Sequence, residues 1–153
     1  GRLAGEGLRQ LEEQARAEQA RALLEALVQA LRVSFKLLCA PKKARVLRRY
    51  LVMALRRLVP LAPGLGAGEA FGPAANLHHL VRDCMACKPE EEPVMLEELF
   101  LALAALGPHL LHELLLWHSE SSENTLTGRV AELGACSTPA VARAASQLLP
   151  LLQ

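Results

Sequence analysis

Residues 93–118 read PVMLEELFLALAALGPHLLHELLLWH, and this stretch decides the fold class. Apolar residues recur at helical spacing on both sides of Gly107-Pro108, a dipeptide typical of a sharp turn. Pro93 stands where a helix can begin, because a proline at the first helical position removes no intrahelical hydrogen bond. The stretch therefore predicts two consecutive helices, and the first of them, 93–106, is apolar enough to be the central buried element.

The same helical pattern continues through the rest of the chain. No run of alternating β-branched residues suggests a strand, and 153 residues suffice for one domain with a sizeable core. We therefore expect an all-α single domain of about six to seven helices over 1–153, built either as a helical repeat or as an irregular helical bundle. Besides 93–106 and 109–118, the expected helices cover residues 8–39, 42–59, 73–87, 126–133 and a final segment from Pro139.

Two segments depart from compact helical packing. A helix over 8–39 would be about 48 Å long, more than a small domain needs, so either residues 1–20 project or the helix breaks near Ala20. Residues 60–73 hold three prolines and four glycines, which predicts a flexible loop within the domain. The chain begins without Met and ends inside an apolar pattern, so we expect it to be a fragment of a longer protein.

The second half of the sequence contains two similar helix pairs, in 93–118 and 126–152. Pro93 and Leu126 are 33 residues apart, and Pro108 and Pro139 are 31 residues apart. The last segment, TPAVARAASQLLPLL, begins with Thr138 as the expected N-cap. This region resembles armadillo or HEAT repeats, mainly over residues 93–152. The resemblance implies stacked helix pairs and a groove that binds other proteins.

A C-x-x-C pair offers the first candidate chemistry. Cys84 and Cys87 have the spacing of zinc and redox sites, and a zinc ion would need two more ligands from His78, His79 or His118. On a helix, however, the two thiols lie on one side, and we interpret them as core-facing residues. Buried free cysteines, without a secretory signal, suggest a reducing compartment, the cytoplasm or the nucleus.

A second candidate combines His109, His112 and Glu113 on one helix, the spacing of a metal-ligand pair beside a carboxylate. It lacks a third partner at a defined spacing, and surface histidines are the simpler interpretation. No Ser-His-Asp order and no strand-flanked glycine loop occurs in the sequence. We therefore expect no enzyme, no cofactor and no metal.

The strongest candidate is a run of basic residues on the second expected helix. No Asp or Glu occurs from Ala26 to Gly68. Solvated helix faces usually mix both signs of charge, so a run without acids suggests a binding surface for an acidic protein segment or for the acidic half of this same fold. The candidate partner-binding residues are Lys42, Lys43, Arg45, Arg48, Arg49, Arg56 and Arg57.

These observations favour a non-catalytic interaction scaffold or adaptor that binds a peptide or helix of a partner protein. The alternative is a helical module that docks on nucleic acid or anionic membrane through helix 42–57, although only Tyr50 is available there for base stacking. The weakly amphipathic segment 8–22 is a further candidate for self-association. Exposed charges contribute little to folding, so we expect the basic residues to matter for binding and not for stability.

Overall fold

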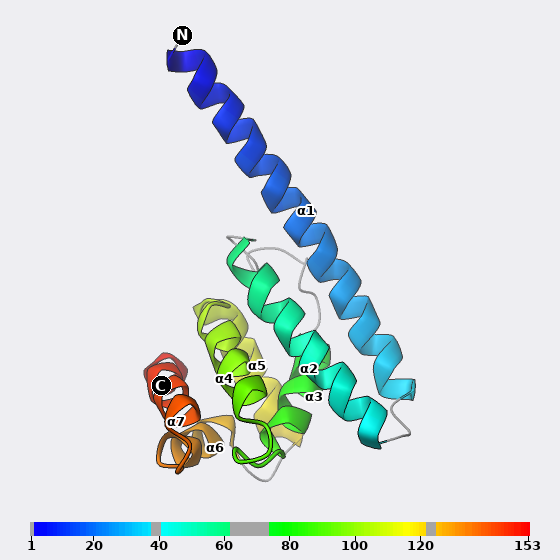
Figure 1. Ribbon diagram of the computed structural model, residues 1–153, viewed down its shortest axis with the longest axis vertical. Coiled ribbons are helices and arrows are strands. Elements are labelled where there is room, and N and C mark those ends of the chain that lie inside the picture. The colour runs from blue at the N-terminus through cyan, green and yellow to red at the C-terminus, as the bar shows by residue number, and fades with distance from the viewer. Residues whose placement is uncertain (1, 38–40, 62–73, 122–124) are drawn as a thin grey trace.

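The computed structural model describes residues 2–37, 41–61, 74–121 and 125–153, and every secondary-structure element in this part of the chain is helical (Figure 1). The fold is an all-α single domain, as the sequence predicts. The elements are α1 (Arg2–Leu37), α2 (Pro41–Leu58), the 3-10 turn η1 (Val59–Leu61), α3 (Ala74–Met85), α4 (Pro93–Ala104), α5 (Pro108–Ser121), α6 (Leu126–Gly134) and α7 (Pro139–Leu152).

The helix boundaries agree with the prolines of the sequence. Pro93 and Pro139 open α4 and α7 within their first turns, because proline is preorganised for a helix start and has no amide hydrogen to lose there. Helix α2 ends at Leu58, one residue before the expected end at Val59, and Pro60 lies in the 3-10 turn η1 that follows it. The remainder of the expected 60–73 loop lies outside the described residues.

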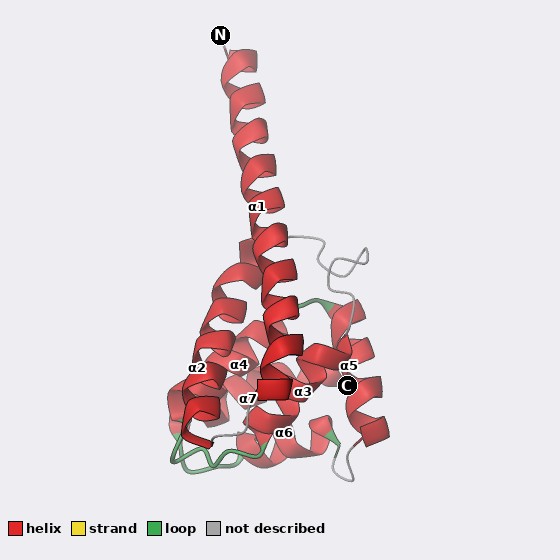
Figure 2. Ribbon diagram, turned by 90° about the vertical axis from the view of Figure 1, so that its right-hand side faces the viewer, coloured by secondary structure: helices red, strands yellow, loops and turns green. Residues whose placement is uncertain are grey.

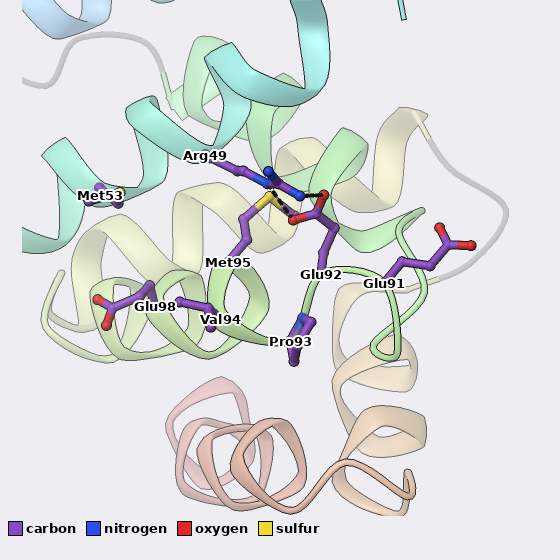
Figure 3. Close-up of a pocket in the computed structure, with 8 residues that line it drawn as sticks. All are labelled: Arg49, Met53, Glu91, Glu92, Pro93, Val94, Met95 and Glu98. Atoms are coloured by element: carbon purple, nitrogen blue, oxygen red, sulfur yellow. Dashed lines mark hydrogen bonds and ion pairs between the residues drawn. The ribbon is translucent and has the colours of Figure 1, made fainter. Parts of the chain in front are cut away.

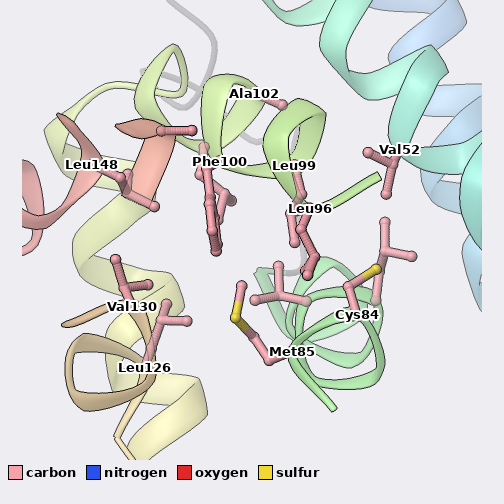
Figure 4. Packing of buried hydrophobic residues seen from close by; sticks show 14 of the residues in the cluster. Val52, Cys84, Met85, Leu96, Leu99, Phe100, Ala102, Leu126, Val130 and Leu148 are labelled. Carbon is pink, nitrogen blue, oxygen red and sulfur yellow. The ribbon is translucent and has the colours of Figure 1, made fainter. Parts of the chain in front are cut away.

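Helix α4 is the centre of the core. Its fully buried residues include Leu96, Leu99, Phe100 and Leu103, and they meet apolar side chains of α2, α3, α6 and α7 (Figure 4). The expectation that 93–106 is the central buried element is therefore confirmed. A helix with apolar residues on most of its circumference must be covered on several sides, and α4 is covered by neighbours from both halves of the chain.

The other helices are arranged around α4. Helices α2, α4 and α7 lie side by side, because α4 packs extensively against both others. Helices α3 and α5 pack against each other behind this row, and α6 packs against α7 (Figure 2). Alternate helices thus stack in the first part of the body, whereas α4 is next packed mainly by α7 and only weakly by α6.

Local chemistry explains the short turns. Gly107 has a φ of 90°, a left-handed conformation that glycine adopts without steric cost, and it reverses the chain between α4 and α5. The side chain of Thr125 accepts a hydrogen bond of 3.0 Å from the Gly128 amide and caps α6. Thr138 occupies the N-cap position of α7 as expected, but its side chain makes no capping hydrogen bond. The expected position is therefore confirmed, and the expected capping interaction is wrong.

Helix α1 is continuous from Arg2 to Leu37, so the alternative of a break near Ala20 is wrong. Its second half lies along α2 and α3, whereas its first half extends beyond the other helices (Figure 1). No helix among the described residues combines the length and the apolar character that crossing a membrane requires.

The packing of α4 makes a stability prediction. Phe100 is fully buried, and Val94 on the same helix is 69% exposed. Phe100→Ala leaves a cavity and should lower the free energy of unfolding by about 3–5 kcal/mol, measured by urea denaturation. Val94→Ala is the matched control and should change it by less than about 0.5 kcal/mol. Equal effects of the two substitutions would contradict the central position of α4.

Candidate functional site

The most unusual polar group of the body is the carboxylate of Glu92, which lies at the N-cap of α4 and is only 4% exposed. It accepts a hydrogen bond of 2.7 Å from Nε of Arg45 and two of 2.8 Å from Nε and Nη2 of Arg49. Figure 3 shows the guanidinium of Arg49 pointing from α2 onto the carboxylate. We call Arg45, Arg49 and Glu92 the arginine clamp.

The electrostatics of the clamp follow from this geometry. The pKa of Glu92 is lowered, and the hydrogen bond from Arg49 is the largest cause. Burial acts in the opposite direction and raises the pKa. The hydrogen bond from Arg45 and the positive charges of both arginines lower it further. Glu92 in turn raises the pKa of Arg49, first through the hydrogen bond and then through its charge. A buried carboxylate is stable only with such partners, and with its pKa lowered Glu92 stays charged at neutral pH.

Two further ion pairs join α2 to α4 and its preceding turn. Arg45 Nη2 lies 3.7 Å from Glu91 Oε2, and Arg56 Nε lies 3.5 Å from Glu98 Oε2. Arg45, Arg49 and Arg56 therefore have acidic partners within the chain, and the acidic half of the same fold supplies them. Arg45 and Arg49 neutralise a buried carboxylate, which argues against the expectation that these two basic residues do not matter for stability.

The remaining basic candidates are not brought together on one acidic partner. Arg57 is exposed and Arg48 is half-buried, with its Nε buried and without a hydrogen bond. Arg48 lines an open hollow of about 410 Å³ together with Cys87 and Lys88. The side chains of Lys42 and Lys43, in the first turn of α2, lie outside the described residues.

A groove lies beside the clamp, between α2 and α4. Its volume is about 310 Å³, and its walls combine the clamp with apolar side chains (Figure 3). We call it the α2–α4 groove; it is lined by Arg49, Met53, Glu91, Glu92, Pro93, Val94, Met95 and Glu98.

Large apolar side chains are exposed along the groove and on the adjoining outer face of α2. Val46, Tyr50 and Met53, which we call the α2 stripe, are 49%, 66% and 43% exposed, and Val94 of α4 adds to them. Sequence reasoning missed this surface. Its signal was present, because positions 46, 50 and 53 have the i, i+4, i+7 spacing of one helix face, but the surrounding basic residues obscured it.

The C-x-x-C pair lies at the end of α3. Cys84 is fully buried in the core, and burial, assisted by Cys87, raises the pKa of its thiol to about 12. Burial also raises the pKa of the half-buried Cys87, whose Sγ lies 3.6 Å from the Asp83 carbonyl oxygen. Both thiols therefore stay protonated at neutral pH, which suits packing and not nucleophilic attack.

The histidines are distributed over different helices. His78 is buried on α3 with its ring 5.4 Å from that of His79, whereas His112 of α5 is exposed. The side chains of His109 and His118 lie outside the described residues. In the part of the chain that the structure describes, no three His, Cys, Asp or Glu residues are grouped as metal ligands.

Comparison of the chain with protein-family models, curated proteins and solved structures finds no match. The class of the protein is thus an all-α helical domain, and the arginine clamp, the α2–α4 groove and the α2 stripe define its candidate site.

The clamp makes a pH prediction. The folded-state pKa of Glu92 lies below its ordinary value of 4.5. The Glu92 carboxylate therefore binds a proton more tightly in the unfolded chain than in the folded protein. The stabilisation is therefore fully present above about pH 4.5 and is lost as the pH falls through the lower, folded-state pKa. Glu92→Gln should lower the free energy of unfolding by about 1–3 kcal/mol at pH 7. The difference from wild type should shrink in urea titrations below about pH 4.5; a constant difference down to pH 3 would contradict the clamp.

A second prediction concerns the arginines. Arg45→Glu with Arg49→Glu places two like charges on the buried carboxylate and should lower the melting temperature by more than Glu92→Gln does. The matched control is Arg57→Glu, on the same helix, for which the structure shows no ion pair among the described residues; it should leave melting nearly unchanged. Circular dichroism measures the melting temperature of each variant. A double variant that melts like wild type would indicate that the basic residues form only a solvated face.

Proposed function

We propose that this chain is a non-catalytic protein–protein interaction domain, a scaffold or adaptor that binds a helix or peptide of a partner protein in the α2–α4 groove. The observation that supports it best is the exposed apolar surface formed by the α2 stripe and Val94 along an open groove. Apolar side chains gathered on a surface and rimmed by charges are typical of interaction sites. Apolar anchors on one helix face, beside a groove, suit recognition of an amphipathic helix.

The dimensions of the surface suit a helical ligand of a few turns. The α2 stripe runs from Val46 to Met53, about 10 Å along the axis of α2. Arg57 lies one turn beyond Met53 and is exposed, so an acidic residue next to the ligand's apolar anchors would complement it. The arginine clamp holds one wall of the groove in place, which reduces the ordering cost of binding.

We further propose that the fold is a short armadillo- or HEAT-like repeat array. The stacking of α2 on α4 and of α3 on α5 supports this, because successive repeats place corresponding helices side by side. The packing of α7 on α4 departs from that order, and we interpret α6–α7 as an irregular terminal pair.

The alternative of docking on nucleic acid or anionic membrane through 42–57 has less support. Arg45, Arg49 and Arg56 face carboxylates of the same chain at 2.7–3.7 Å, so fewer cations remain for phosphate groups. Such binding would weaken steeply between low and physiological salt, whereas capture through the apolar groove would persist.

As part of the proposal, we place the domain in the cytoplasm or the nucleus. Cys84 is packed in the core as a protonated thiol, and reduced core cysteines are common in these compartments.

Site-specific photocrosslinking tests the proposed function. A photoreactive residue in place of Met53 should crosslink to a helix of a partner protein, and Met53→Glu should weaken binding of the purified partner segment at least tenfold by burying a charge in an apolar contact. A photoreactive residue in place of Arg143, which is exposed on α7, is the control and should not crosslink to that helix. Equal crosslinking from both positions, or unchanged affinity of Met53→Glu, would contradict the groove as the binding site.

A further inference from the structure

The projecting half of α1 carries an apolar surface that its own body does not cover. Every described residue from Glu6 to Gln19 is exposed except Gly7 and Ala17, which are intermediate. Leu8 and Leu11 are 63% and 64% exposed. An isolated helical segment of this length is marginal in water, so a second surface that covers these leucines would stabilise it.

The leucines lie on one side of the helix. Residues three and four apart share a helix face, and Leu8, Leu11, Ala15 and Ala22 therefore form a narrow stripe, which we call the α1 seam. Segment 6–18 contains four acids and two bases, so the helix around the seam is net negative. Glu12 adjoins Leu11, and Glu18 lies between Ala15 and Ala22 along the seam.

The α2 stripe has matching properties. Leu8 and Leu11 are three residues apart, as are Tyr50 and Met53, so both pairs rise about 4.5 Å along their helix axes. Segment 42–57 contains seven bases and no acid, and the three acidic partners on and before α4 leave it with excess positive charge. The cations of α2 thus complement the acidic seam along the α2 stripe, whereas the groove itself is lined by three acids, Glu91, Glu92 and Glu98, and one base, Arg49.

The α1 seam cannot contact the α2 stripe of the same chain. Helix α1 is unbroken from Arg2 to Leu37, and its first half points away from α2 and α4 (Figures 1 and 2). A second copy has no such restriction. We propose that the α1 seam of one copy occupies the α2–α4 groove and α2 stripe of another, reciprocally, in a two-fold symmetric dimer.

This inference rests on the proposed function, because it assigns an occupant to the same groove. In a reciprocal dimer, each copy gives one seam and receives one, so the same contact forms twice. Loss of either surface on both copies removes both contacts, whereas loss of the seam on one copy and of the stripe on the other leaves one contact intact. This asymmetry distinguishes the proposal from direct pairing of two α1 helices.

Two double variants test it by sedimentation equilibrium, over a concentration series up to about 100 μM. Leu8→Glu with Leu11→Glu removes the seam, and Tyr50→Glu with Met53→Glu removes the stripe. All four side chains are exposed, so folding should be retained, as circular dichroism will check. We expect dimers of wild type, monomers of each variant alone, and a heterodimer in their equimolar mixture.

Leu151→Glu is the matched control, since Leu151 is about half-exposed near the end of α7, and it should dimerise like wild type. A monomeric wild type would overturn the inference. So would a stripe variant that dimerises like wild type, because the α1 helices would then pair with each other. If wild type stays monomeric while a photoreactive residue at Met53 crosslinks to a helix of another protein, the proposed function stands without the dimer. If that residue crosslinks neither to a second copy nor to another protein, the dimer and the proposed function both fail.

Discussion

The buried carboxylate of Glu92 is the constraint on which the body of this protein depends. A charge that is 4% exposed must be compensated, and Arg45 and Arg49 do so with three hydrogen bonds of 2.7–2.8 Å. Because both arginines come from α2 and Glu92 is the N-cap of α4, the clamp fixes how α2 is rotated about its axis. With that rotation set, Val52 and Leu55 face the core, and Tyr50 and Met53 face solvent.

The same rotation produces the candidate site. An amphipathic helix normally directs its large apolar residues inward, yet α2 is apolar on two faces. The inner face packs on α4, and the outer face adjoins the groove (Figure 3). An apolar surface that a rigid packing arrangement keeps exposed is available for binding without rearrangement. The clamp therefore connects the stability of the domain to the shape of its proposed interaction surface.

Helix α1 shows the same division along its length. Its second half is part of the body, and its first half extends past it with two exposed leucines. The domain thus has two exposed apolar surfaces of opposite charge. One is the narrow α1 seam on an acidic helix segment, and the other is the α2 stripe on a basic helix. The proposed association by helix docking rests on this combination. The thiols of Cys84 and Cys87 stay protonated at neutral pH, because burial raises the pKa of both.

The sequence by itself determined the helices and the centre of the core. Helical periodicity, the prolines at 93 and 139 and the turn at Gly107 are local signals, and the apolar residues of α4 cover so much of its circumference that most of this helix must lie in the core. Only the tertiary structure decided the partners of the basic residues, because Arg45 and Arg49 lie 47 and 43 positions from Glu92. It also decided that Thr125 caps its helix and Thr138 does not. Long-range pairing and side-chain geometry depend on how helices pack, which periodicity does not encode.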